Sequence, residues 1–162
     1  MPQQAKTLLM GAAVGLLLGV LSVQWQPQGA TSHRDALPQA AVKVVNRATE
    51  LINEMDYRAF EIFDRDAFFN LGDRYVFVLA ADGTVIYHAA DRSQIGADFA
   101  ALRDIDRRPF GRHLITDVSP DGVWSAYHWR NPISQSTAWK LTFTRQTRQG
   151  HIVGAGIFAA SD

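Results

Sequence analysis

Two runs of β-branched and aromatic residues on either side of an Asp-Gly pair constrain the fold of this chain more than any other feature. Residues 75–80 read YVFVLA and residues 84–88 read TVIYH, with Ala81-Asp82-Gly83 between them. Two such runs joined across an Asp-Gly turn give the strongest short-range signal for a β-hairpin. The sequence therefore predicts an antiparallel sheet that begins at Tyr75.

The remaining pattern places a helix before this hairpin and three strands after it. Apolar residues between 45 and 59 recur at spacings of three and four, which predicts a long helix with Asp35 near its start and Pro38 in its first turn. The later strands are predicted over residues 123–129, 139–146 and 151–158. The order predicts an α+β fold, in which a five-stranded antiparallel sheet carries a long N-terminal helix across one face.

Two stretches of this pattern are less regular. Between the helix and the hairpin, a short second helical segment and a turn that opens at Asp64 are expected, with Gly72 ending them. Residues 89–116 have no long periodic run, and only a short helix over residues 99–102 is predicted there. A long irregular segment within a small domain usually forms a binding loop or a lid. We therefore expect the functional site beside residues 89–116.

The N-terminal region has the composition of a membrane or export segment. The stretch from Thr7 to Trp25 is nineteen residues long and uncharged, which is enough to cross a bilayer as a helix. Lys6 ahead of it predicts a cytoplasmic N-terminus with the rest of the chain outside. A cleaved secretory signal is the alternative, because Ala30-Thr31-Ser32 offers the small residues found at cleavage sites.

Either alternative predicts export and the same division of the chain. Residues 1–25 are expected to form a signal anchor or signal peptide, residues 26–37 a polar linker, and residues 38–160 one domain. The expected location is the periplasm, with an N-terminal helix tethering the domain to the inner membrane.

Composition excludes several classes of function. Sixteen basic and sixteen acidic residues give a formal net charge of zero, and a neutral chain lacks the positive field that nucleic acids require. The chain has no cysteine, which rules out thiol catalysis, disulfides, iron–sulfur clusters and cysteine-built zinc sites. We therefore expect no nucleic-acid partner and no cofactor.

A series of short motifs in a fixed order carries a resemblance to a known family. In chain order the motifs are GDRYVFV at 72–78, DGTV at 82–85, His88, Ile95-Gly96, Leu102 with Asp104 and Asp106, Pro109-Phe110, Tyr127-x-Trp129-x-Asn131-Pro132, Lys140, and VGAGIF at 153–158. Their spacing is more specific than any one of them. Over residues 38–158 the chain resembles the single Cache domain of the second type, a PAS-like extracytoplasmic sensor of small molecules.

The resemblance implies a PAS-like sheet with a small organic ligand held between the sheet and the irregular segment. By position, the residues that line the ligand site would be Tyr75, Phe77, His88, Tyr127, Trp129 and Lys140. Period two independently puts Tyr75 and Phe77 on one face of their strand. Lys140 is expected to neutralise a carboxylate that His88 and the tyrosine hydroxyls orient. The alternative for the four aromatic residues is an ordinary place in the core.

The chain departs from the family pattern in a short segment between the third and fourth strands, from Ile133 to Ala138, and at two single residues. Arg130 stands where the family often has proline, and Phe143 replaces a tyrosine, which removes a hydroxyl that could bind a ligand. Two other groups carry simpler expectations. Asp104 and Asp106 are interpreted as turn residues rather than as a metal site. The basic residues nearby are expected to lie on a solvated loop: Arg103, Arg107, Arg108 and Arg112.

The function predicted from these features is a non-catalytic sensory module for a small organic molecule, in particular a carboxylate. Because only four residues follow Phe158, signalling is expected to pass through a separate partner, such as a membrane signalling protein. A stand-alone periplasmic binding or interaction protein is the alternative. A small hydrolase is disfavoured because the chain has no GxSxG or HExxH motif, and a haem-binding sensor using His88 or His128 because neither lies in a CxxCH or HxxxH arrangement.

Overall fold

The computed structural model describes residues 33–159, with side chains from Leu37 onwards. Helix α1 (His33–Met55) comes first, and its apolar residues Val45, Ala48 and Ile52 are buried as the spacing predicts. Pro38 lies inside this helix rather than in its first turn, because the helix already begins at His33. The predicted anchor at residues 1–25 lies outside the described residues.

Short elements connect α1 to the sheet: η1 (Asp56–Arg58), α2 (Ala59–Arg65), η2 (Ala67–Phe69) and β1 (Asn70–Leu71). The turn predicted to open at Asp64 instead begins at Asp66, whose Oδ1 accepts a hydrogen bond from the Phe68 amide at 2.9 Å. Asp64 is a residue of α2. In residues 33–159 no helix has the length and apolar character needed to span a membrane.

The sheet contains the five predicted strands, namely β2 (Arg74–Leu79), β3 (Val85–His88), β4 (Val123–Arg130), β5 (Thr137–Gln146) and β6 (Ile152–Phe158). All neighbours are antiparallel in the order β3-β2-β6-β5-β4, and the two-residue β1 also pairs with β2. At the predicted hairpin turn, Asp82 Oδ1 accepts a hydrogen bond from the Thr84 amide at 2.9 Å, and Gly83 has a φ of +93°. The predicted PAS-like architecture is confirmed.

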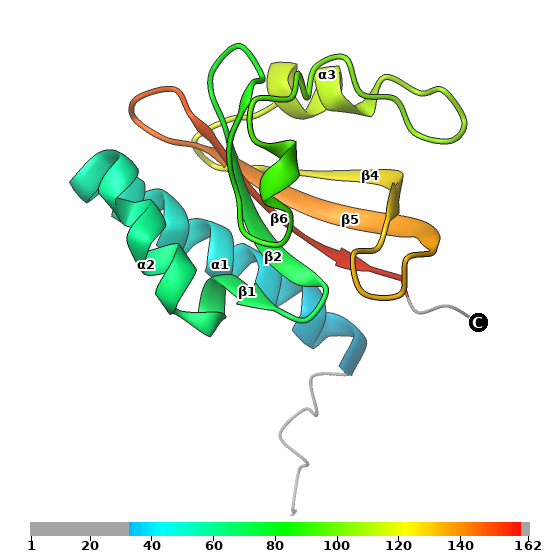
Figure 1. Cartoon of the computed structure of the whole chain (residues 1–162), viewed down its shortest axis with the longest axis horizontal. Coiled ribbons are helices and arrows are strands. Elements are labelled where there is room, and N and C mark those ends of the chain that lie inside the picture. The colour runs from blue at the N-terminus through cyan, green and yellow to red at the C-terminus, as the bar shows by residue number, and fades with distance from the viewer. Residues whose placement is uncertain (1–32, 160–162) are drawn as a thin grey trace, which may run out of the picture. The chain divides into compact units, whose positions relative to one another are not determined.

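Each face of the sheet is covered by a different part of the chain (Figure 1). Helix α1 packs on one face, over a cluster that includes Val44, Ala48, Val76 and Val153. The segment 89–116 lies over the opposite face, where the cluster contains Tyr75 and other aromatic side chains. The irregular segment therefore covers the face on which the ligand site is predicted.

Within this covering segment the helix lies elsewhere than predicted. Residues 99–102 form only a turn, whereas α3 (Phe110–Thr116) is a helix of seven residues. A Cβ atom at Gly111 would lie 1.8 Å from the Phe99 carbonyl oxygen, so glycine allows α3 to pack directly against that backbone. Glycine is a poor helix former, and seven residues are too few for a clear period, which explains why the sequence pattern missed α3.

Candidate ligand-binding site

Strand pairing brings the six residues of the predicted site together. In the register of the sheet, Tyr127 lies opposite Lys140 and Phe77 lies opposite His88. Because side chains alternate along a strand, Tyr75 and Phe77 share a face, as do Tyr127 and Trp129. All six predicted residues line one cavity.

Lys140 is the most unusual residue of this cavity, because its side chain is only 2% exposed. Its Nζ donates a hydrogen bond to the Tyr75 hydroxyl at 2.7 Å and lies 4.0 Å from the centre of the Tyr75 ring. The rings of Phe77 and Phe158 lie 5.6 and 5.3 Å from the same nitrogen. The ammonium is thus enclosed by aromatic rings, an arrangement that favours a cation.

No carboxylate of the described residues lies within ion-pair distance of Lys140. Burial lowers the pKa of Lys140 from 10.5 to about 7, while the more distant charge of Asp73 acts in the opposite direction. A buried cation without an anion is expensive, and lysines are almost never fully buried unless they are paired. The site therefore contains a positive group that has no counter-ion and that gains or loses its proton near neutral pH.

Two glycines in β6 make room for this arrangement. A Cβ atom at Gly156 would lie 2.5 Å from Lys140 Cε, and one at Gly154 would lie 2.2 Å from the Phe77 ring. Contacts this close are not tolerated between packed atoms. The glycines of the motif at 153–158 therefore let the lysine stem and the Phe77 ring lie flat against the backbone of β6.

His88 closes the cavity at the end of β3 and is 7% exposed. Its Nδ1 accepts a hydrogen bond from the Asp91 amide at 2.9 Å, and its ring lies 4.8 Å from the Tyr75 ring. Burial, followed by the charge of Lys140, lowers the pKa of His88 to about 4. At neutral pH the imidazole is therefore uncharged and carries its proton on Nε2, where it can donate to a ligand.

The hydroxyl groups of the site are held in place by buried hydrogen bonds. The hydroxyls of Tyr127 and Thr142 lie 2.9 Å apart. Burial raises the pKa of both Tyr75 and Tyr127 well above the ordinary value for tyrosine. Both phenols are therefore protonated at any physiological pH and can act as donors.

Two phenylalanines of the covering segment, neither of which was predicted as a site residue, pack on the aromatic residues of the site, and one of them, Phe99, lines the cavity. Phe110 stacks on Tyr127 with ring centres 4.0 Å apart, and it meets Trp129 edge-on at 5.5 Å. Phe99 stacks on Phe77 at 5.6 Å. The motif Pro109-Phe110 does not reveal this contact, since nothing local in the sequence indicates which ring of the sheet Phe110 packs against.

The site consists of two neighbouring pockets that share part of their lining, called here its inner and its outer part. The inner part, beside Lys140, has a volume of about 10 Å³, which is the space of roughly one water-sized probe. The outer part has a volume of about 350 Å³. Four residues line both parts: Tyr75, His88, Gln94 and Trp129. The remaining residues of the outer part are Ala90, Asp91, Arg130, Pro132 and Gln135. A pocket of this size is at the lower end of the range for small-molecule sites.

Arg130, which departs from the family pattern, therefore lies at the mouth of the pocket. Phe143 does not. Its ring belongs to the cluster under α1, 5.1 Å from the Trp124 ring, so the absence of a hydroxyl there does not affect the pocket. Residues 143 and 140 differ by an odd number of positions on β5, which places their side chains on opposite faces of the sheet.

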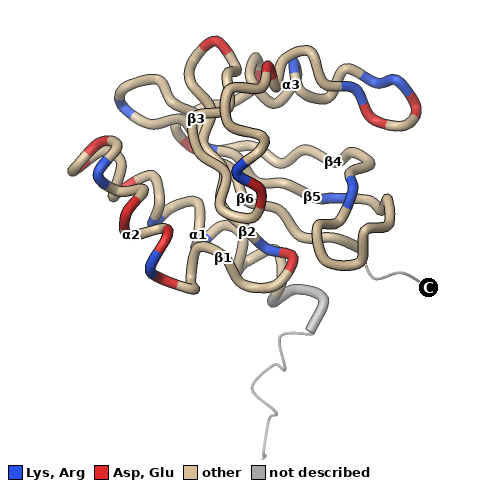
Figure 2. Tube along the Cα trace, viewed as in Figure 1, with Lys and Arg blue, Asp and Glu red and all other residues tan. Residues whose placement is uncertain are grey.

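The charged residues of the loop after Leu102 lie away from the pocket lining. Arg103, Arg107, Arg108 and Arg112 are exposed, as expected, and Figure 2 shows basic and acidic residues interleaved along this loop. Asp104 is a turn residue, since its Oδ1 accepts hydrogen bonds from the amides of Asp106 and Arg108, each at 2.9 Å. Asp106 lies in the same turn, and its Oδ2 is 3.3 Å from the imidazole Nδ1 of His128.

Comparisons with known proteins agree with this architecture. Among solved structures, a methyl-accepting chemotaxis protein from Vibrio parahaemolyticus RIMD 2210633 is 21% identical with a TM-score of 0.63, covering 77% of this chain and 87% of that one. A structure described as "Structural basis for carboxylic acid recognition by a Cache chemosensory domain" is 16% identical with a TM-score of 0.63, covering 80% of this chain and 99% of that one. A periplasmic sensor domain of a chemotaxis protein is 18% identical with a TM-score of 0.59, covering 78% of this chain and 92% of that one.

No curated protein matches the sequence. The family model described as Single Cache domain 2 matches residues 19–160, which is most of the chain. These residues include every strand of the sheet and the whole of the candidate site. The chain belongs to the Single Cache domain 2 family.

Proposed function

We propose that this chain is an extracytoplasmic sensory domain that binds a small carboxylate beside Lys140. The observation that carries the proposal is the buried ammonium of Lys140, which has no carboxylate partner in residues 33–159. A buried charge is stable only when it is paired, and a carboxylate bound in the cavity supplies the missing partner. Every polar group around Lys140 also suits such a ligand.

The proposed binding mode uses the donors that converge on the cavity. The carboxylate accepts hydrogen bonds from Lys140 Nζ, the Tyr75 hydroxyl and His88 Nε2, while the aromatic rings of Phe77 and Trp129 exclude water. The Lys140–Tyr75 hydrogen bond of 2.7 Å opens to admit it. Because the inner part holds about 10 Å³, the rest of the ligand lies in the outer part of about 350 Å³. This limits the ligand to a small organic acid.

Family membership supports the sensory role, since the chain shares its architecture with sensor domains of chemotaxis proteins. One structural relative is described as recognising a carboxylic acid. At 16% identity that relative supports the fold, so the carboxylate assignment for this chain rests on Lys140 and its surroundings. The membrane signalling partner and the tether at residues 1–25 stay predictions.

Isothermal titration calorimetry on the purified full-length chain tests the proposal. The panel consists of acetate, propionate, pyruvate and lactate, the corresponding neutral amides, several amino acids and several purines. We expect at least one carboxylate to bind and its amide to fail. Lys140→Met should weaken that binding by at least about 30-fold, because truncating one partner of a buried charge pair costs about 2–5 kcal/mol.

The matched control is Lys43→Met, since Lys43 is exposed on α1 and lies outside the site. Carboxylate affinity should be unchanged in this variant. Binding of an amide as tight as that of the acid, or equal loss in both lysine variants, would overturn the proposal. Mass spectrometry of the ligand recovered after incubation separates binding from turnover, and a chemically altered ligand would favour the hydrolase alternative.

A further inference from the structure

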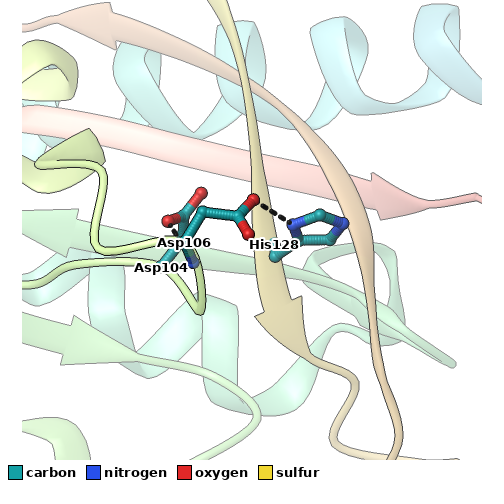
Figure 3. Close-up of side chains that lie close together, drawn as sticks. All are labelled: Asp104, Asp106 and His128. Carbon is teal, nitrogen blue, oxygen red and sulfur yellow. Dashed lines mark hydrogen bonds and ion pairs between the residues drawn. The ribbon is translucent and has the colours of Figure 1, made fainter.

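A second group of polar side chains lies outside the ligand pocket, where the loop after Leu102 meets the edge strand β4 (Figure 3). An oxygen from each of Asp104 and Asp106 and a ring nitrogen of His128 all lie within 4.8 Å of one another. Asp106 Oδ2 and His128 Nδ1 are 3.3 Å apart. Two ligands bound to one metal ion at about 2.1 Å are separated by roughly this distance.

Asp104 supplies the observation that points to a missing partner. Its side chain is 7% exposed, and Oδ1 is already occupied by the amides of Asp106 and Arg108. Oδ2 is shielded from solvent and has no hydrogen-bond partner among the described residues. A buried carboxylate oxygen without a donor costs free energy, and a native structure normally satisfies it with a water or an ion.

His128 also contributes a buried polar atom that lacks a hydrogen-bond partner. Its Nδ1 is shielded from solvent and makes no hydrogen bond within the described residues, although it lies within ion-pair distance of Asp106. The imidazole is held in place by Trp139, whose ring centre is 4.0 Å away. The imidazole nitrogen and the unsatisfied carboxylate oxygen belong to the same close group of side chains, so both are available to a third species.

We propose that Asp104 Oδ2, Asp106 Oδ2 and His128 Nδ1 bind a divalent transition-metal ion, with Zn²⁺ as the first candidate. One nitrogen and two carboxylate oxygens form a ligand set that Zn²⁺ accepts, with water completing the coordination. The interpretation of Asp104 as a turn residue still holds, because the turn uses Oδ1 and leaves Oδ2 for the ion. The absence of cysteine excludes thiolate zinc sites but not this one.

One positive group competes with the ion. Arg108 Nη1 lies 3.8 Å from Asp106 Oδ2, and the two side chains are 63% and 45% exposed. An ion pair this exposed contributes little, so a divalent cation displaces the guanidinium at small cost. The ion would join the covering segment to β4, the strand that carries Tyr127 and Trp129 in the ligand pocket.

The test is a titration of the full-length chain with Zn²⁺ after removal of any affinity tag and treatment with a chelator. We expect one ion to bind per chain, and His128→Gln to weaken binding by more than about 100-fold because it removes a direct ligand. The matched control is His113→Gln. His113 is paired with Asp117 at 3.8 Å on α3, and both side chains are largely exposed.

Histidine side-chain ¹⁵N spectra locate the bound ion. Addition of Zn²⁺ should shift the Nδ1 signal of His128 and leave that of His113 unchanged. Asp106→Asn, which keeps the shape of the side chain, should weaken Zn²⁺ binding as well, and its unfolding curve shows whether the variant is folded. Binding that survives in His128→Gln, or a wild-type chain that binds no Zn²⁺, would overturn the proposal.

Discussion

The face of the sheet under α1 is filled with aliphatic and aromatic side chains, whereas the opposite face buries a lysine and a histidine among its aromatic rings. The same strands serve both faces. In β6, Val153 and Ala155 lie under α1, while Gly154 and Gly156 lie against Phe77 and Lys140. One face therefore stabilises the fold by apolar burial, and the other holds polar groups whose burial opposes folding.

The largest effect expected from this difference is on the helix face. Phe63 is 1% exposed and packs on Phe69 with ring centres 4.5 Å apart. Phe63→Ala should lower the free energy of unfolding by about 3–5 kcal/mol, because it removes a buried ring and leaves a cavity. Chemical denaturation measures the loss. Phe68→Ala is the control, since Phe68 is 38% exposed, and an equal loss in both variants would contradict the prediction.

On the pocket face, removal of a buried side chain is expected to raise the free energy of unfolding. Lys140→Met replaces a buried cation that has no counter-ion with an apolar side chain of similar length, and should raise the free energy of unfolding by about 1–4 kcal/mol at pH 7. Carboxylate binding should be lost in the same variant. Denaturation in the absence of ligand measures the gain, and a clear loss of stability would show that the ammonium is already compensated.

The effect of Lys140 on stability should also depend on pH. The folded pKa of Lys140 is about 7 against an ordinary value of 10.5, so between these values the unfolded chain binds more protons than the folded chain. Stability should therefore rise with pH across this window, by at most about 1.4 kcal/mol per pH unit. The measurement is the difference between wild type and Lys140→Met at several pH values. A difference that does not change from pH 7 to 10 would refute the shift.

The smallest effect concerns one hydrogen bond on the pocket face. Thr142→Val removes the hydroxyl that lies 2.9 Å from that of Tyr127 and should lower stability by about 1 kcal/mol. Thr144→Val is the matched control, because its hydroxyl makes only a 3.5 Å contact with the Val123 carbonyl. Thermal unfolding compares the two variants, and the prediction fails if Thr144→Val costs as much as Thr142→Val.

The sequence predicted the strands well because period two and the Asp-Gly turn are local signals. The position of α3 was missed, because this short helix is held by tertiary packing of Phe110 and Leu114, which Gly111 permits by lying against the Phe99 backbone, and not by a helical period. Phe143 shows that a family pattern can also indicate a residue that does not line the pocket. The family pattern drew attention to it, but its position on β5 directs it toward α1.

The candidate site was predictable only in part for a similar reason. The six residues on the sheet follow from the resemblance and from strand register, which fixes Tyr127 opposite Lys140. Phe99, Phe110 and Gln94 come from the covering segment, and their contacts with the sheet depend on how a long irregular chain closes over it. No local pattern encodes such contacts.

The glycines of β6 also affect packing across the sheet. On the pocket side of this strand Gly154 and Gly156 contribute no side chain, and on the other side Ala155 is buried beneath α1. Lys140 and the helix are thus separated by the thickness of a single backbone at this point. Because no glycine side chain lies between them, the lysine stem and α1 pack against opposite sides of the same strand.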